Sequence, residues 1–443
     1  MTSNQTSTAA GRFSRREFLR RYGIASSALT LSPFFLDRLA TALAATPNFT
    51  RVYKVKNGDC FQNTAKLWEM LGGAAKYIGA TDVVVIKGNA QWPYQGYTHT
   101  GCIKGVIDQI LAIPNFSGEV IICDNVQQGG TAGQFAFDIP VNYRTRNWPD
   151  HSWNSLAAAY QAAGKPVSCK QWLCSPWRNI TFPGTSTWNP ADGEGWTRTF
   201  FTHAGLNLFL SAPVFQSPLN SNRLIDIQKG VWENGAYTGR KVKTIFMPTL
   251  NNHGVGNDDY AGITSAIKTF FGATEIPVFE DSLWNGYYHI HSASYTQRLA
   301  SSATVAGELV GRFLNLMYRP NLFITAAMWS GHYSRTGAAT ETKTVLACEN
   351  PVTLDYIACR DVISPYAAWL NPDQNNNTRK QILGCQSQGI GTIDPQQIEV
   401  LEYDFANPSA NRLDIERKLR DFKAGQATEQ DVKNVIRLYM ESN

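Results

Sequence analysis

The sequence predicts an α/β fold: a mainly parallel sheet with helices on both faces, followed by a C-terminal helical hairpin. Two short runs rich in β-branched residues, 82–87 and 119–124, have the composition of buried strands. Between them, apolar residues recur at helical spacing over 103–113. Two buried strands joined through a helix form a βαβ unit, whose strands run parallel. The 12 Trp, 18 Tyr and 22 Phe residues indicate a packed globular protein.

A first helix is predicted over 64–78, where apolar residues again recur at helical spacing before Gly79. Residues 125–235 are harder to interpret, because they are rich in Gly, Pro, Asn and Trp and contain few long periodic segments. Long irregular stretches in compact proteins are usually functional or inserted. We therefore expect one α/β domain over 45–405, with an insertion around 125–235.

Regular patterns return at residue 242. The predicted elements are a strand over 242–247, helices over 260–271 and 295–318, strands over 321–327 and 343–348, a helix over 350–362, one more helix after the polar loop 371–378, and a strand over 398–403. Asn350 followed by Pro351 is typical of a helix N-terminus, because the Asn side chain caps the helix and Pro needs no backbone partner there.

The last segment, 406–443, differs in character from the rest of the chain. Two amphipathic helices are predicted over 412–424 and 428–440, joined at Gly425. Thr428 with Asp431 three residues later resembles a capping box. We expect a helical hairpin that docks on the body of the protein or on a protein partner.

Residues 1–44 have the layout of a twin-arginine export signal. Arg15 and Arg16 precede an apolar run over 22–36, and Ala42-Leu43-Ala44 fits the small-x-small cleavage pattern. A short membrane anchor is the alternative, but Ser and Pro residues interrupt the run, and it is shorter than the roughly 20 residues of a spanning helix. We expect a periplasmic protein that meets the twin-arginine translocase during export and does not span the membrane after cleavage.

The charge of the predicted mature chain is nearly balanced. The whole chain has 40 basic and 35 acidic residues, and residues 1–44 hold six arginines and two acids, so 34 basic and 33 acidic residues remain. A net charge of +1 gives no electrostatic reason to expect nucleic-acid binding, which needs a clustered basic face.

All eight cysteines follow residue 44, and an even count permits disulfides in an oxidising compartment. Cys169 and Cys174 flank Trp172 in a loop-like stretch and are the best candidate pair, with two free thiols as the equal alternative. Cys123, Cys348 and Cys359 lie in apolar segments and are expected to be core thiols. The cysteine spacings match no zinc, iron–sulfur or haem pattern.

The first candidate site lies at the ends of the two buried strands. Lys87 ends the first strand and is followed by Gly88 and Asn89, whereas Asp124 ends the second. In open α/β sheets, ligands bind beyond the carboxyl ends of the strands. We expect Lys87, Asn89 and Asp124 to face one crevice, with Gly88 allowing close approach of a ligand to the backbone. The alternative for Lys87 is a solvated strand end.

The second candidate site runs from the strand containing Lys243, through a loop with His253, to Lys268. A histidine between Asn and Gly in a loop can act as a general base, an oxyanion partner or a metal ligand. A lone loop histidine is more often structural. Two lysines on the same strand–loop–helix segment favour an anion-binding or acid–base site.

A metal site is the third candidate. His289 and His291 would share one face of a strand and could ligate a divalent metal, with Glu280 or Asp281 supplying an oxygen and His332 as a looser candidate. No third ligand is identified, and the spacing matches no recognised metal motif. The cofactor therefore stays unknown, and the chain contains no iron–sulfur, P-loop or dinucleotide motif and no serine-hydrolase elbow.

Several of these segments, taken together, resemble the family catalogued as domain of unknown function 362. The resemblance covers most of residues 80–365, and its motifs are the strands ending at Lys87 and Asp124, Lys243 with its histidine loop, residues 262–272 and residues 344–355. Gly88 stands where the family has proline, and the histidine loop is longer than in the family pattern. Many members also carry ferredoxin-like cysteine clusters, which this chain lacks.

The resemblance implies an α/β fold and a site built from six residues: Lys87, Asp124, Lys243, His253, Lys268 and Asp355. We expect Lys87, Asp124, His253 and Lys268 to be catalytic and Lys243, Asn89 and Asp355 to bind substrate. Asp355 lies in the first turn of a predicted helix, where the alternative role is to complement the helix dipole.

The resulting hypothesis is an exported enzyme that binds a small anionic or metal-chelating substrate in a crevice at the strand ends. A non-catalytic periplasmic binding or assembly protein and a metal-containing redox protein are the alternatives. Bound metal would favour an enzyme or redox protein, whereas capture of a protein partner by a metal-free monomer would favour an assembly role.

Overall fold

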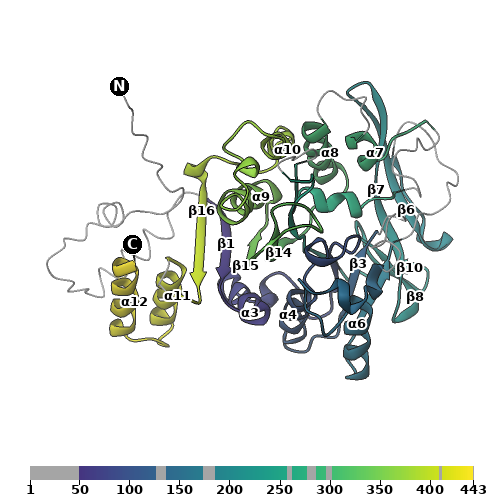
Figure 1. Cartoon of the computed structure of the whole chain (residues 1–443). Coiled ribbons are helices and arrows are strands. Elements are labelled where there is room, and N and C mark those ends of the chain that lie inside the picture. Colours follow the sequence, from purple (N-terminus) through teal and green to yellow (C-terminus); the bar gives the residue numbers. More distant parts are fainter. Residues whose placement is uncertain are drawn as a thin grey trace, which may run out of the picture.

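The computed structural model describes residues 49–125, 136–172, 185–256, 262–276, 286–295, 302–408 and 412–442. Within them the protein has an α/β fold, with a ten-stranded mixed sheet, a separate six-stranded sheet, and a pair of helices at the C-terminus (Figure 1). The predicted export signal and Cys174 lie outside the described residues.

The large sheet is mixed but mostly parallel, which confirms the predicted fold class at this level. Its strand order is β16 (Ile398–Asp404), β1 (Thr50–Lys56), β15 (Thr340–Cys348), β14 (Leu322–Gly331), β11 (Val242–Phe246), β2 (Val83–Lys87), β3 (Glu119–Asp124) and β4 (Val167–Gln171). All neighbours from β14 to β4 are parallel, whereas β15 runs antiparallel to both its neighbours. Two short strands, β12 (Leu250–Asn252) and β13 (Ile263–Thr264), form a hairpin beside β14.

The central strands are buried because both sides of each strand contact a hydrophobic core. Val83 and Val85 belong to one core cluster, whereas Val84 and Ile86 belong to the other, as the two-residue period of a strand requires. The second cluster also contains side chains of α3 (Cys60–Leu71), α4 (Thr100–Leu111) and α6 (Trp153–Ala162). The first contains side chains of α8 (Ser302–Leu316), α9 (Pro351–Ala358) and α10 (Asn377–Gln386).

The prediction of a helix over 260–271 is wrong. In the described part of this segment, Ile263–Thr264 forms β13 and Lys268–Gly272 forms a short 3-10 helix. Backbone amides that would donate within a helix donate to distant side chains here. The Ile263 amide donates to the Gln381 side chain, and the Ala266 amide donates to the Asp355 carboxylate. The predicted helix over 295–318 is confirmed in its described part, where α8 begins at Ser302. Residues 296–301 lie outside the described residues, and the short helix α7 (Ile290–Tyr295) precedes them.

The six-stranded antiparallel sheet lies in the later part of the predicted irregular insertion, whose earlier part contains α6 and β4. It comprises β5 (Thr185–Ser186), β6 (Gly195–His203), β7 (Leu206–Ser217), β8 (Asn220–Asp226), β9 (Gly230–Glu233) and β10 (Ala236–Tyr237). The pairs Ala204-Gly205 and Asn234-Gly235 have positive φ at both residues and connect successive strands. Two consecutive positive φ values are typical of tight hairpin turns, so Asn234-Gly235 was a hairpin signal in the sequence.

The C-terminal helices α11 (Arg412–Lys423) and α12 (Glu429–Ser442) form the predicted helical pair beside β16 (Figure 1). The Thr428 amide donates to the Asp431 carboxylate at 2.8 Å, and the Asp431 amide donates to the Thr428 hydroxyl at 3.2 Å. This reciprocal pair caps α12. No helix in the described ranges combines the length and hydrophobicity needed to cross a bilayer.

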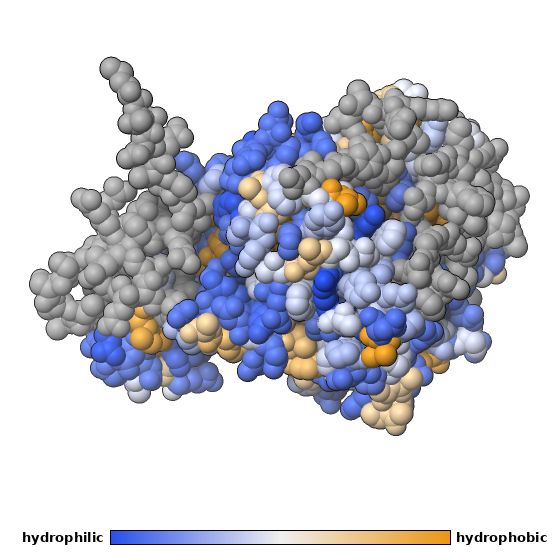
Figure 2. Space-filling view, in the orientation of Figure 1, coloured by the Kyte–Doolittle hydropathy of each residue, from blue (hydrophilic) through white to orange (hydrophobic). Residues whose placement is uncertain are grey.

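The described cysteines are free thiols, and Cys123, Cys348 and Cys359 are buried in the core as predicted. Cys169 is free as well, with its Sγ 3.2 Å from the carbonyl oxygen of Trp153. The described face of the protein in Figure 2 is mainly hydrophilic, with apolar residues in small separate patches.

Candidate functional site

The candidate site is a pocket at the carboxyl ends of β2 and β3. Lys87 is the last residue of β2 and Asp124 the last of β3. Asn89, two residues after β2, and Asn125, the first after β3, line the same pocket. Its empty volume, which includes the solvent-open mouth, is about 530 Å³. This is the position at which open α/β sheets bind ligands.

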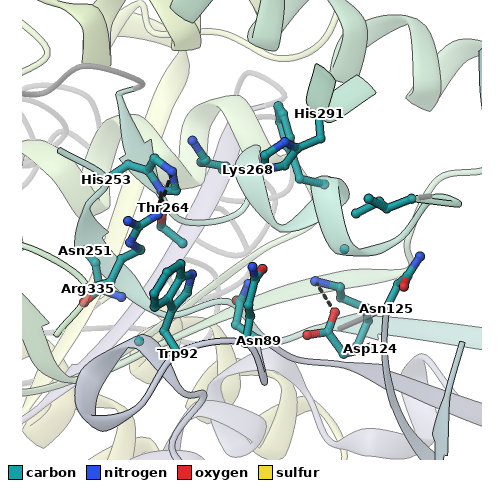
Figure 3. Close-up of a pocket in the computed structure, with 16 residues that line it drawn as sticks. Asn89, Trp92, Asp124, Asn125, Asn251, His253, Thr264, Lys268, His291 and Arg335 are labelled. Carbon is teal, nitrogen blue, oxygen red and sulfur yellow. Dashed lines mark hydrogen bonds and ion pairs between the residues drawn. The ribbon is translucent and has the colours of Figure 1, made fainter. Parts of the chain in front are cut away.

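Other segments of the chain complete the pocket (Figure 3). His253 and Thr264 come from the β12–β13 hairpin, Lys268 from the 3-10 helix, and His291 from α7, while Arg335 follows β14. Figure 3 shows His253, Thr264 and Arg335 on one side of the pocket and Asp124 with Asn125 on the other. Four residues predicted as catalytic (Lys87, Asp124, His253 and Lys268) and one predicted to bind substrate (Asn89) therefore lie in one pocket.

Lys87 and Asp124 form a buried ion pair. The Lys87 Nζ is 3.1 Å from Asp124 Oδ1 and donates to the Thr269 hydroxyl at 2.9 Å. The second Asp124 oxygen accepts from the Ala90 amide at 2.8 Å. Burial lowers the pKa of Lys87 and raises the pKa of Asp124, because each charged form loses water, and the mutual attraction opposes both shifts.

Two glycines, Gly272 and Gly88, permit close packing at this end of the sheet. A Cβ on Gly272 would lie 2.5 Å from Asp124 Oδ1 and 2.9 Å from Lys87 Nζ, so only glycine fits there without moving the pair. A Cβ on Gly88 would lie 2.6 Å from the Trp153 ring. Gly88 therefore permits close packing of Trp153, and the prediction that it lets the backbone approach a ligand is not supported by its position.

His253 is held as a neutral imidazole with a defined tautomer. Arg335 Nη1 lies 2.9 Å from His253 Nε2, and because a guanidinium can only donate, Nε2 must accept. The proton is therefore on Nδ1, which lies 3.0 Å from the Thr264 hydroxyl oxygen and donates to it. Burial, followed by the charges of Lys268 and Arg335, lowers the pKa of His253 well below its usual value.

The described lining of the pocket is cationic. Lys87, Lys268 and Arg335 contribute three positive charges, and among the described lining residues Asp124 contributes the one negative charge, so the formal sum is +2. The Lys268 side chain is 5.4 Å from the centre of the Phe271 ring, and the Arg335 guanidinium lies 4.2 Å from the centre of the Trp92 ring. Trp92 thus supports Arg335 through a cation–π contact.

No family model, curated protein or solved structure matches this chain. The resemblance to the domain of unknown function 362 family stays a prediction.

His289 and His291 do not share a strand face, because α7 begins at Ile290. His289 Nδ1 accepts from the Ser292 amide at 3.3 Å, so His289 caps α7, whereas His291 lines the pocket. Their ring centres are 6.2 Å apart. Within the described ranges, no group of three His, Cys, Asp or Glu residues has the arrangement of a metal site; Glu280 and Asp281 lie outside these ranges.

Lys243 and Asp355 lie outside the pocket lining. Lys243 pairs with Val84 near the start of β11, about 10 Å from the pocket end of the strand at 3.3 Å per residue. The Asp355 carboxylate, on α9, accepts from the backbone amides of Ala266 and Ile267 at 2.7 and 2.9 Å. Burial raises the pKa of Asp355 to about 7. Asp355 therefore positions the segment that carries Thr264 and Lys268.

A second buried ion pair anchors the other end of this segment. Arg198, on β6, donates to Glu275 through Nε at 2.6 Å and Nη2 at 2.8 Å, and both side chains are fully buried. The next residue, Ile276, lines the pocket. The small sheet therefore helps to fix the wall of the pocket.

Sequence reasoning missed Arg335 and Trp92. The predicted strand over 321–327 ended too early, since β14 continues to Gly331, and Arg335 lies in the turn that follows. Polar residues between Gly331 and Gly337 were a turn signal directly after an apolar strand. Applying the strand-end rule to this longer strand would have identified Arg335 as a candidate.

Proposed function

We propose that this protein is an enzyme that binds a small anionic substrate in the pocket and transfers a proton through His253. The observation that supports this most directly is the convergence of Lys268 and Arg335 beside a neutral imidazole. The described carboxylate of the pocket is already paired with Lys87. Among the described lining residues, an anion would therefore meet two further cationic side chains, Lys268 and Arg335, in a partly desolvated site, where electrostatic attraction is stronger than in water.

The acid–base part of the proposal rests on the state of His253. A general base must be neutral, oriented and close to the substrate. His253 is neutral because burial and nearby cations lower its pKa. The Arg335 contact at Nε2 sets its tautomer, with Nδ1 donating to Thr264. Lys87 and Asp124 would supply a second proton-exchanging pair at the opposite side of the pocket.

The setting of this activity is also a proposal. Export by the twin-arginine route would place the enzyme in the periplasm, with helices on both faces of the sheet restricting entry to the strand ends. The terminal helices would form a hairpin available to a protein partner.

A non-catalytic anion-binding protein is the second candidate function. It is favoured by the Arg335 contact that occupies Nε2 of His253.

Calorimetric titration of the full chain with acetate, benzoate and inorganic phosphate tests the proposal. Charged hydrogen bonds contribute about 1.5–3 kcal/mol, so Lys268→Ala should weaken binding roughly 10- to 100-fold. Lys380→Ala removes an exposed lysine on α10 and is the matched control. Absence of binding by all three anions, or equal affinity of wild type and Lys268→Ala, would contradict the proposal.

A further inference from the structure

The contact between Arg335 and His253 blocks the atom that a general base needs. Nη1 of Arg335 lies 2.9 Å from Nε2 of His253, so the imidazole lone pair already accepts a hydrogen bond. The other ring nitrogen, Nδ1, holds its proton toward Thr264. With Arg335 in this position, neither nitrogen of His253 is available to take a proton from a substrate.

The guanidinium has a better acceptor available whenever an anion enters. A hydrogen bond from Arg to a carboxylate is charge-assisted and roughly twice as strong as one to a neutral group. The planar guanidinium can also bind both carboxylate oxygens at once. Because Arg335 lies against the Trp92 ring, that ring can continue to support it after a small movement.

We infer that the substrate is a small organic carboxylate, which binds between Lys268 and Arg335, draws the guanidinium away from His253 and so makes His253 the proton acceptor. This inference rests on the proposed function and adds the substrate class and the way the base is exposed. Until the correct anion is bound, His253 would therefore not accept a proton from a substrate.

The lining of the pocket favours an organic carboxylate over a bare inorganic anion. Trp92, Phe271 and Ile276 provide apolar surface beside the two cations. A carboxylate with a short hydrocarbon or aromatic body would use both features. The planar donor edge of Arg335, supported on its face by Trp92, matches the plane of a carboxylate.

The proton balance of the step is simple. One bond between a substrate atom and its hydrogen breaks, its electron pair stays on the substrate as the conjugate base, and the proton forms an N–H bond with the lone pair on Nε2. His253 becomes an imidazolium that still donates from Nδ1 to Thr264. The described groups that face or influence His253 are Thr264 from β13, Lys268 from the 3-10 helix, His291 from α7 and Arg335 after β14. The three ionisable groups among them disfavour the imidazolium, and a bound carboxylate would offset their effect.

Nitrogen-detected NMR of the full chain with 15N-labelled histidine tests the inference. We expect saturating benzoate or acetate to shift the Nε2 resonance of His253 and to raise its pKa by roughly one unit or more, which is tenfold in proton affinity. In Arg335→Ala, the Nε2 resonance should already be shifted without any carboxylate. Arg335→Lys keeps the charge and serves as the second variant if Arg335→Ala fails to fold.

The outcomes separate the inference from the function on which it rests. If calorimetry shows that benzoate binds but the Nε2 resonance and pKa of His253 do not change, the inference fails and anion binding stands. If neither carboxylates nor phosphate bind, the proposed function itself fails. If phosphate binds more tightly than benzoate and produces the larger shift at His253, the assignment of a carboxylate substrate is overturned.

Discussion

Lys87 and Asp124 are joined as an ion pair at the adjoining ends of β2 and β3, 3.1 Å apart, with side chains that are 0% and 3% exposed. Both belong to parallel neighbours, so the register of the sheet brings their ends together. The pair is therefore part of the framework of the pocket as well as of its chemistry.

Replacing one member of this pair should lower the free energy of unfolding more than replacing both. Lys87→Met or Asp124→Leu leaves an unpaired buried charge, which costs about 3–5 kcal/mol of unfolding free energy. The double variant should recover much of that loss. Urea unfolding measures the stability of all three variants. Lys104→Ala, which breaks a half-exposed pair with Asp108, should cost no more than about 1 kcal/mol. Additive losses in the double variant would contradict this expectation.

Asp355 should make stability depend on pH. Its pKa is about 7 in the folded protein, against 3.8 for an unperturbed Asp, so the folded state binds more protons between these values. The stabilisation from this group is complete below about pH 4 and is lost as the pH rises to about 7, with a slope of at most about 1.4 kcal/mol per pH unit.

Asp355→Asn tests this dependence. The amide offers one oxygen where the carboxylate offers one to each of the Ala266 and Ile267 amides, so we expect a loss of about 1–3 kcal/mol at pH 4 that becomes smaller toward pH 7. The difference in unfolding free energy between wild type and variant should change between pH 4 and pH 7. A constant difference across that range would show that Asp355 does not titrate there.

His289 and His291 should behave differently when replaced. His289→Ala removes the cap of α7 and should cost about 0.5–2 kcal/mol without changing anion affinity. His291→Ala changes the pocket lining and should alter affinity. Elemental analysis of both variants addresses the predicted divalent metal: a stoichiometric metal lost in either variant would support the metal prediction and contradict a simple capping role.

Arg198→Lys should show how far the small sheet supports the pocket. Lysine keeps the charge but cannot make the two parallel hydrogen bonds to Glu275, so the variant should lose about 1–3 kcal/mol of stability. Anion affinity should fall too, because Glu275 precedes Ile276 in the pocket wall. Unchanged affinity with lowered stability would limit the role of Arg198 to folding.

The parallel strands at the centre of the sheet were predictable from sequence because each strand has its own local pattern. The runs ending at Lys87 and Asp124 are short, apolar and closed by polar residues, and their parallel pairing places those ends together. Strand-end reasoning also identified Asn89 and His253, whereas Lys268 was a candidate because it shares a strand–loop–helix segment with His253. Lys243 was misplaced because it belongs to the start of β11, and strand-end reasoning applies only to the other end.

The remaining parts depend on contacts between distant segments. The helical pattern near Lys268 was overridden by Asp355, which is 89 residues away from Ala266 in the sequence. Arg335 reaches His253 across 82 residues, and no local pattern specifies that distance. The small sheet is different, since its Asn234-Gly235 turn was visible in the sequence and was overlooked.

The spread of the pocket along the chain has a consequence for protein synthesis. Its described lining residues run from Lys87 to Arg335, and the clamp on the Ala266 and Ile267 amides is supplied only by Asp355. A nascent chain still lacking Asp355 would carry every described lining residue and yet leave the Ala266 and Ile267 amides, next to Lys268, without their carboxylate acceptor. Ligand present during translation would therefore stabilise only chains that are nearly complete, and fragments truncated before α9 would gain no such protection from degradation.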